Sequence, residues 1–311
     1  MTISTEGYIT DVPGIRVGHA HDLDARTGCT VVLPDQAAVA GADVRGSAPG
    51  TRELELLRPL RLIQKVHALL LTGGSAFGLD AAGGVQHYLE ERNIGYDTAV
   101  AKVPIVPAAV IFDLAVGDSQ IRPDKEMGYA ACKNATVDEN RQGRIGVGAG
   151  ASVGKILGQH HAMDGGVGSC AAKLEDVTIG VFVVVNALGN IIDPASGKTI
   201  AGARHPKTGR FIDPIKQLSA LHRTSFSQIS NTTLAVLATD AKLDRLQAIK
   251  VAQMAQNGIA KAITPAHTTF DGDITFALSV GSKNADINAL GALGAELVVQ
   301  AILNSVRNQS I

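Results

Sequence analysis

The chain has 311 residues, of which 45% are hydrophobic and 18% charged, and its formal net charge at pH 7 is −1. This is the composition of a globular protein with a large buried core, and it excludes a disordered chain. A net charge so close to zero gives no field that would attract nucleic acid or an anionic membrane surface, so we expect neither as a partner.

The N-terminal residues lack the basic start and apolar stretch of a secretory signal peptide. The most apolar region, 99–116, is interrupted by a lysine, an aspartate and two prolines, and therefore predicts no transmembrane helix. Cys29, Cys132 and Cys170 are widely spaced and do not have the spacing of a metal or redox site. Together these features predict a cytoplasmic protein with buried, free thiols.

Short apolar runs bounded by Gly, Pro or Asp predict β-strands at 15–17, 29–33 and 37–44. Within this region His19 and His21 stand two residues apart. Such a pair at a strand end can open a zinc site of an amidohydrolase, but the site needs further ligands. The remaining histidines are scattered along the sequence, and none of them form a His-x-x-x-His pair. A solvated turn is therefore the favoured interpretation, and we expect no metal or other cofactor.

The continuous apolar run 66–71 predicts a strand buried on both faces, and a helix is expected from about residue 76 to residue 92. The glycines at 73 and 74 suit a tight turn, but they do not form the Gly-x-Gly-x-x-Gly pattern of a dinucleotide site. Ser75 does not match a hydrolase nucleophile, because the pattern Gly-x-Ser-x-Gly is absent around it.

The glycine-rich stretch 143–155 imitates a P-loop without matching it. Ala149 stands at the leading glycine position, and Ile156 replaces the Ser or Thr that would bind magnesium. This departure excludes a kinase or nucleoside triphosphatase. The glycines are better explained by main chain that passes close to a substrate or a partner strand. Lys155 closes the stretch, and a lone lysine in such a place is usually solvated.

The valine-rich run 177–185 predicts a buried strand that ends at Asn186. An asparagine there usually forms a turn, although its amide N–H₂ can also stabilise an oxyanion. Residues 198–230 are polar and contain several glycines and prolines, which predicts a long surface loop. This loop would end at the Asn231–Thr232 bond and leave that bond accessible to water.

An Asn-Thr-Thr triplet at 231–233 precedes the apolar, strand-like run 234–238. An Asn-Thr bond can cleave itself: the Thr232 hydroxyl attacks the Asn231 carbonyl, the acyl group shifts from nitrogen to oxygen, and water releases it. The new chain then begins with a threonine whose α-amine, of unperturbed pKa about 7.7–8.0, is the base that activates its hydroxyl. Alone, the triplet is weak, because most such triplets are ordinary strand starts.

Beyond the triplet, apolar spacing predicts an amphipathic helix at 241–263, a strand at 274–280 and an apolar helix at 285–306. Asp271 and Asp273 precede the strand, and an extended backbone places carboxylates two residues apart on one side. With no internal repeat and no clear linker, the sequence predicts one domain over 1–311. Its fold class is mixed, α/β or α+β.

Seven segments carry a further signal through their order along most of the chain: Pro13–His19, Leu71–Leu79, Pro107–Asp113, Gly148–Lys155, Asn186–Gly189, Asn231–Thr233 and Asp271–Asp273. This set resembles a family of self-cleaving hydrolases typified by the DmpA L-aminopeptidase/D-esterase. The family includes β-aminopeptidases and nylon-oligomer (6-aminohexanoate-oligomer) endohydrolases. The resemblance implies a four-layer αββα sandwich like that of N-terminal-nucleophile hydrolases, cleaved into 1–231 and 232–311. It also implies a homo-oligomer, with a tetramer favoured.

The resemblance also implies a role for each candidate site residue. Thr232 would be the nucleophile, with its own α-amine as the general base. Asp271 and Asp273 would accept hydrogen bonds from the amine or the hydroxyl. Lys155 would supply a positive charge near the nucleophile, and the Asn186 side chain would bind the oxyanion. Some family members carry a tyrosine at the substrate-cleft position that aligns with Phe112, so this chain lacks that hydroxyl.

The β-aminopeptidase branch of the family has Ser and Glu at the positions of Asp271 and Asp273, whereas the nylon-oligomer branch has two aspartates. This favours an endo-acting hydrolase of linear oligoamides such as 6-aminohexanoate oligomers. The alternative is an aminopeptidase or amidase acting on short peptides or amino-acid amides. Two other classes stay open: a metal-dependent amidohydrolase built on His19 and His21, and an uncleaved, non-catalytic binding or assembly protein of the same fold.

Overall fold

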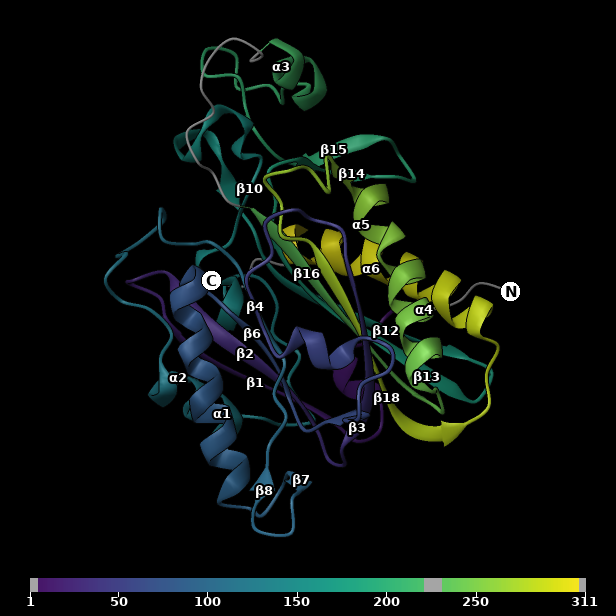
Figure 1. The fold of residues 1–311 in the computed structure, drawn as a ribbon. Helices are drawn as coiled ribbons and strands as arrows, with labels where there is room; N and C mark the ends of the chain where they lie inside the picture. Colours follow the sequence, from purple (N-terminus) through teal and green to yellow (C-terminus); the bar gives the residue numbers. More distant parts are fainter. Residues whose placement is uncertain (1–4, 221–230, 308–311) are drawn as a thin grey trace.

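A computed structural model describes residues 5–220 and 231–307 (Figure 1). Its centre is a six-stranded mixed sheet in which only β16 and β18 run parallel. In spatial order its strands are β12 (Gly166–Leu174), β13 (Val177–Asn186), β16 (Thr232–Ala241), β18 (Ile274–Lys283), β3 (Ala38–Val44) and β5 (Lys65–Val66). Every residue of β13 and β16 is buried, which agrees with the continuous apolar runs that predicted these strands.

A five-stranded sheet packs face to face against the first. In spatial order it contains β1 (Ile15–Asp22), β2 (Thr27–Pro34), β6 (Leu69–Thr72), β9 (Ala108–Val110) and β4 (Thr51–Arg52). The layer between the sheets is apolar, with Val32 and Leu71 from this sheet and Val236 and Phe276 from the six-stranded one in a single cluster. Such a layer stabilises the pair through the hydrophobic effect, at about 25 cal/mol per Å² of buried apolar area.

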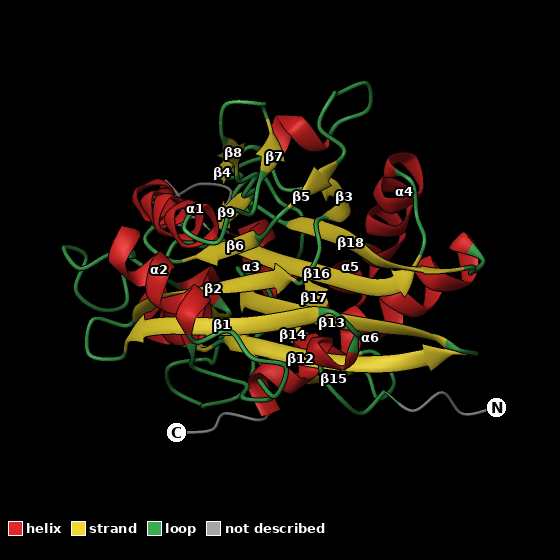
Figure 2. Cartoon of the chain, turned by 90° about the horizontal axis from the view of Figure 1, so that it is seen from below, coloured by secondary structure: helices red, strands yellow, loops and turns green. Residues whose placement is uncertain are grey.

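Helices cover the outer face of each sheet (Figures 1 and 2). The five-stranded sheet is covered by α1 (Ala81–Glu90) and α2 (Lys125–Lys133), and the six-stranded sheet by α4 (Arg245–Ala255), α5 (Asn257–Ala262) and α6 (Ile287–Arg307). Two of these helices begin at aspartate caps, since Asp124 accepts from the Met127 N–H and Asp244 from the Gln247 N–H. The order helix, sheet, sheet, helix confirms the predicted four-layer sandwich.

Smaller elements surround the sandwich. The strands β7 (Tyr96–Asp97) and β8 (Lys102–Val103) form one ribbon, β10 (Ser152–Val153) and β11 (Met163–Asp164) a second, and β15 (Lys198–Ala201), β14 (Asn190–Asp193) and β17 (Ile263–Thr264) a three-stranded sheet. The short helix α3 (Pro214–Ala220) lies at the top of Figure 1 and contacts the 3₁₀ turn Lys155–Leu157. Short 3₁₀ helices occur at Ile9–Asp11, Leu54–Leu57, Ser75–Asp80, Gly146–Gly150, Lys155–Leu157 and Gln159–His161.

Some predicted boundaries are wrong. The run 66–71 divides between two sheets, because the main chain of His67 leaves β5 to bond with Ile105 before β6 begins. The helix predicted from residue 76 begins only at Ala81, after a 3₁₀ turn in which Gly78 lies against the Gly73 carbonyl.

The predicted helix 241–263 is two helices that meet before Gly258. A β-carbon at Gly258 would lie 2.3 Å from the Ala295 carbonyl oxygen of α6, so the glycine permits close packing of α5 on α6. The predicted loop 198–230 contains β15 and α3, and its last part, 221–230, lies outside the described residues. Among the described helices, α6 is long and apolar enough to cross a membrane. Its most apolar stretch of 18 residues has a mean hydropathy of 1.5, but 67% of that stretch is buried inside the protein.

Candidate active site

The predicted site residues meet at one end of the six-stranded sheet. Thr232 opens β16, and Asn186, the last residue of β13, lies opposite it in antiparallel register. The segment 271–273 leads into β18, which runs parallel to β16, and Asn231 forms a bridge with Asp271. The sheet topology thus brings together segments that lie 40 or more residues apart in the sequence, as Thr233 and Asp273 do.

The Asn231–Thr232 bond is held by hydrogen bonds around its carbonyl. The Asn231 N–H donates to the Phe270 carbonyl at 3.0 Å, and the Asn231 carbonyl accepts from the Gly272 N–H at 2.7 Å. The Thr232 hydroxyl donates to the same carbonyl oxygen at 2.5 Å, so the nucleophile lies beside the group that it would attack. Because an N–H donor stabilises negative charge on a carbonyl oxygen, this arrangement favours an acyl shift from nitrogen to oxygen.

The bond is buried in the uncleaved chain. Asn231 is 0% exposed and Thr232 is 3% exposed. The prediction that the bond is accessible to water at the end of a surface loop is therefore wrong. The attack itself requires no water, because the nucleophile and the carbonyl belong to adjacent residues, and water is needed only to release the resulting ester.

Lys155 is buried at 1% exposed, unlike the solvated lysine that its sequence context favours. Its Nζ donates to the Asn186 side-chain oxygen at 2.8 Å and to the Asn186 carbonyl at 3.0 Å. Burial lowers the pKa of Lys155 to about 7, although the charges of Asp271 and Asp113 act to raise it. The lysine therefore titrates near neutral pH, which is unusual for an ammonium group.

Asn186 connects this lysine to the five-stranded sheet. Its Oδ1 accepts from the Ser152 N–H at 3.0 Å as well as from Lys155, and its Nδ2 donates to the Phe112 carbonyl at 3.0 Å. An amide nitrogen carries two hydrogens, so the bond to Phe112 leaves one for a further acceptor. Phe112 itself is half-buried, and its contact with Asn186 is through the main chain.

The two aspartates lie in different surroundings. Asp271 Oδ2 accepts from the Thr268 N–H at 2.7 Å and from the Thr268 hydroxyl at 2.6 Å. Burial and the charge of Asp273 raise the pKa of Asp271 to about 6, against the opposing effects of the Thr268 hydrogen bonds and the Lys155 charge. Asp271 is therefore a stronger base than an ordinary aspartate.

Asp273 is held by the main chain and by a histidine. Its Oδ1 accepts from the Thr233 N–H at 2.7 Å, while its Oδ2 accepts from the His267 N–H at 3.1 Å and lies 2.8 Å from His267 Nδ1. In the uncleaved chain, these hydrogen bonds of Asp273 thus go to groups other than the Thr232 hydroxyl.

Two residues near the site were missed by the sequence analysis. Asp113 is buried, accepts from the Gly74 N–H at 2.7 Å and the Thr27 hydroxyl at 2.8 Å, and contributes to the electrostatic surroundings of Lys155. The signal for Asp113 was its place next to Phe112 in a motif. His267 had no signal beyond its position four residues before Asp271.

The histidines of the metal hypothesis serve packing in this structure. His19 Nδ1 lies 2.8 Å from the Thr30 hydroxyl, and His21 Nδ1 accepts from the Gly146 N–H at 3.2 Å. Burial lowers the pKa of His19 to about 4, so its imidazole is neutral at pH 7. Within the described ranges 5–220 and 231–307, no group of three or more His, Cys, Asp or Glu side chains is placed to hold a metal ion.

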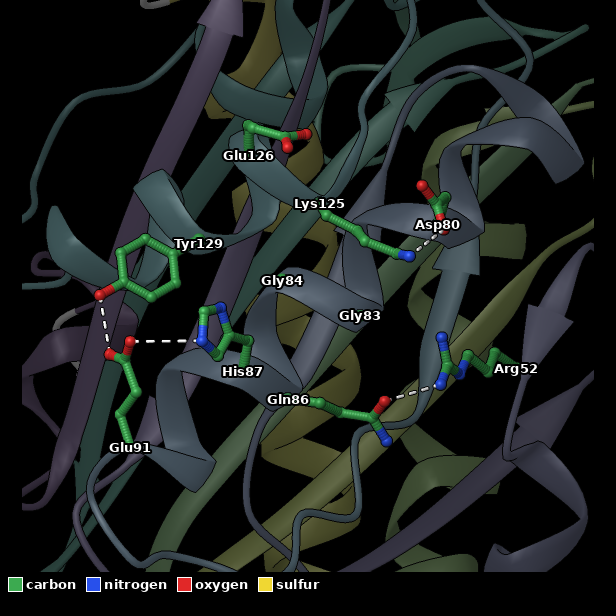
Figure 3. A pocket seen from close by; sticks show the side chains of 10 residues that line it. All are labelled: Arg52, Asp80, Gly83, Gly84, Gln86, His87, Glu91, Lys125, Glu126 and Tyr129. Carbon is green, nitrogen blue, oxygen red and sulfur yellow. Dashed lines mark hydrogen bonds and ion pairs between the residues drawn. The ribbon is translucent and has the colours of Figure 1, made fainter.

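A groove of about 840 Å³ lies at α1, α2 and β4 (Figure 3), and it contains none of the predicted catalytic residues. Most of its polar side chains pair with one another: Arg52 with Gln86, Lys125 with Asp80, and Glu91 with both Tyr129 and His87. This groove is therefore separate from the site at Thr232.

Comparison with known proteins agrees with this architecture. Peptidase family S58 matches residues 7–310. The chain is 42% identical over 329 residues to an uncharacterised aminopeptidase of Mycobacterium bovis, covering 96% of this chain and 93% of that protein. It is 31% identical over 313 residues to a 6-aminohexanoate-oligomer endohydrolase of Kocuria sp., covering 96% and 85%.

The solved structure of an L-aminopeptidase D-Ala-esterase/amidase from Ochrobactrum anthropi, a variant of the N-terminal-nucleophile hydrolase fold, matches with a TM-score of 0.71. The match covers 98% of this chain and 87% of that chain at 18% identity, which shows a shared fold. Contrary to the branch suggested by Asp271 and Asp273, the chain is more similar to the aminopeptidase than to the endohydrolase. It is a hydrolase, and it belongs to Peptidase family S58.

Proposed function

We propose that this protein is a self-cleaving hydrolase with Thr232 as its mature nucleophile, and that it acts as an aminopeptidase or amidase on short peptides and amino-acid amides. The observation that carries the first part is the Asn231 carbonyl, which accepts from both the Gly272 N–H and the Thr232 hydroxyl. The second part is supported by the 42% identity to an aminopeptidase.

Maturation begins when the Thr232 hydroxyl oxygen attacks the Asn231 carbonyl carbon and its proton passes to Asp271, whose raised pKa suits a proton acceptor. The Gly272 N–H holds the resulting oxyanion. Collapse breaks the carbon–nitrogen bond, returns a proton to the nitrogen and leaves Asn231 as an ester on the threonine oxygen. Water then hydrolyses the ester, which gives chains 1–231 and 232–311.

In the mature enzyme, the Thr232 oxygen attacks the substrate carbonyl and the free α-amine accepts its proton. The charge of buried Lys155, beside Asn186, stabilises the negative charge that develops in the transition state. The second amide hydrogen of Asn186 binds the oxyanion, a contact whose removal typically costs about 10²–10³ in rate. The α-amine then gives the proton it accepted to the nitrogen of the leaving amine, which departs first, and water releases the acyl group from the threonine.

Replacing Gly272 with alanine is expected to slow self-cleavage by about tenfold or more. The added β-carbon would lie 2.8 Å from the Thr232 hydroxyl oxygen and 2.7 Å from the Ala48 carbonyl oxygen, so it would displace the nucleophile or the main chain around it. The measurement is the fraction of intact chain over time by mass spectrometry of freshly expressed protein.

Gly83→Ala is the matched control for Gly272→Ala. Its β-carbon would lie 3.1 Å from Lys125 Cε, the mobile end of a side chain, and it is in the groove of Figure 3, away from Thr232. This control is expected to cleave at the wild-type rate. If Gly272→Ala also cleaves at that rate, the proposed geometry of attack is wrong.

A paired assay with amino-acid p-nitroanilides and 6-aminohexanoate oligomers tests the proposed substrate class. We expect fully cleaved protein to hydrolyse the anilides faster. The endohydrolase is kept as a second candidate because Asp271 and Asp273 match that branch and the Kocuria enzyme is 31% identical. Turnover of the oligomers alone would favour the endohydrolase, and turnover of neither would contradict both.

A further inference from the structure

We propose that His267 is a positioning residue of this enzyme: it fixes the Asp273 carboxylate against the Thr233 N–H and thereby sets the orientation of the N-terminal Thr232. This inference rests on the proposed function of Thr232 as the mature nucleophile. It adds a residue that forms no part of the catalytic set implied by the family resemblance.

The hydrogen bonds of Asp273 identify it as an anchor for main chain. Its carboxylate is buried, at 2% exposed, accepts from the main-chain N–H groups of Thr233 and His267, and lies 2.8 Å from the ring Nδ1 of His267. Two carboxylate oxygens offer about four acceptor positions, so these donors use most of the capacity. Asp273 therefore has little left for a substrate and instead fixes the residue that follows the nucleophile.

His267 adopts a backbone conformation that suits this task. Its φ is 56°, in the left-handed region that is uncommon for residues other than glycine. In this conformation its N–H and its ring Nδ1 both reach the same oxygen of Asp273. Strained conformations of this kind persist where the surroundings determine them, and they are concentrated at functional sites.

The tautomer of His267 follows from its partner. A carboxylate accepts hydrogen bonds, so Nδ1 carries the hydrogen that points at Asp273. The other ring nitrogen, Nε2, is buried and has no hydrogen-bond partner among the residues of 5–220 and 231–307. Within those residues, the polar contact of the ring is therefore made with Asp273.

Cleavage increases the importance of this anchor. Once the Asn231–Thr232 bond is broken, Thr232 is joined to the protein through its bond to Thr233 alone, and the Thr233 N–H is the group that Asp273 holds. Without the imidazole donor, the carboxylate keeps one fewer partner and can turn away from Thr233. A displacement of about 1 Å at a nucleophile can cost about 10²-fold in rate, so the loss should be seen in kcat with KM unchanged.

The test compares His267→Ala with His267→Asn. Alanine removes the ring donor and is expected to lower both the self-cleavage rate and the kcat of the mature enzyme by about tenfold to thirtyfold. Asparagine tolerates the left-handed conformation and offers an amide donor near the position of Nδ1, so it should restore both rates to within about threefold of wild type. A purely structural histidine would instead change the yield and melting temperature and leave the kcat of the folded enzyme unchanged.

Glu175→Ala is the control for backbone strain. Glu175 also has a φ of 56°, but it is exposed in the turn between β12 and β13, so it shares the conformation without the contact to Asp273. It should keep wild-type kinetics. In a double-mutant cycle, the protein that carries both His267→Ala and Asp273→Asn should lose less kcat than the product of the two single losses, because both changes act on one interaction.

Histidine ¹⁵N NMR of wild-type protein reads the protonation of the imidazole ring directly. A protonated Nδ1 on His267, assigned by its absence from His267→Asn, supports the proposal, and a bare Nδ1 overturns it. Multiplicative losses in the cycle, or a wild-type kcat in His267→Ala, also overturn it. If Thr232→Ala keeps its activity, the proposed function itself fails, whereas an inactive Thr232→Ala beside a normal His267→Ala rejects this inference alone.

Discussion

Replacing Thr232 with alanine is expected to leave one uncleaved chain of 32.2 kDa and to abolish hydrolysis. The change removes the oxygen that attacks Asn231, so neither the ester nor the free α-amine can form. It therefore removes the nucleophile and the base of the mature enzyme at once, and the loss in kcat should be at least about 10⁴-fold. The measurement is the intact mass of denatured protein, followed by a turnover assay.

Wild-type protein should show two chains under the same conditions, the smaller beginning Thr232-Thr233-Leu234. Thr232→Ser keeps a hydroxyl and should still cleave. Thr233→Ala is the neighbouring control, because Asp273 binds the N–H of Thr233, which alanine preserves. If Thr232→Ala hydrolyses substrate as fast as wild type, the catalytic centre lies elsewhere in the molecule.

The strands that build the site could be read from the sequence, because strands buried on both faces appear as continuous apolar runs. The runs at 177–185 and 234–238 became β13 and β16, whose ends place Asn186 opposite Thr232. The run 66–71 was misread because hydropathy does not show where a chain passes from one sheet to another. That break depends on the contact of His67 with Ile105, which is distant in sequence.

In the site, too, some features are visible in the sequence and others arise only from contacts in the folded chain. The Asn-Thr-Thr triplet and the Asp-Gly-Asp segment are visible in the sequence, and the family resemblance supplies their order. The burial of Lys155 is not visible, because its Nζ is covered by Asn186 at the end of β13, a residue 31 positions away. His267 could not be predicted either, since both its left-handed backbone and its contact with Asp273 are properties of the folded chain.

Replacing Lys155 with methionine is expected to lower kcat by about 10²–10³-fold, the usual effect of losing one group that stabilises charge in the transition state.

The titration of the same lysine should also be visible in the pH profile of wild-type turnover. Because its pKa is lowered to about 7, its charge is present below that pH and is lost as the pH rises through it. Turnover should therefore fall above about pH 7, and Lys155→Met should lack this alkaline limb. Lys216→Met, at a side chain that is 86% exposed, should keep it.

Asp271 should produce the acid limb of the same profile. Its pKa is raised to about 6, so it is ionised above that pH and protonated as the pH falls through it. Lys155 lowers the pKa of Asp271, so Lys155→Met should move the acid limb to higher pH. Conversely, Asp271 raises the pKa of Lys155, so in the fraction of Asp271→Asn protein that has cleaved, the alkaline limb should move to lower pH. Because each of these groups shifts the pKa of the other, this reciprocity is a stricter test than either limb alone. A wild-type rate that instead rises above pH 7, with the rise lost in Lys155→Met, would make the neutral lysine a base.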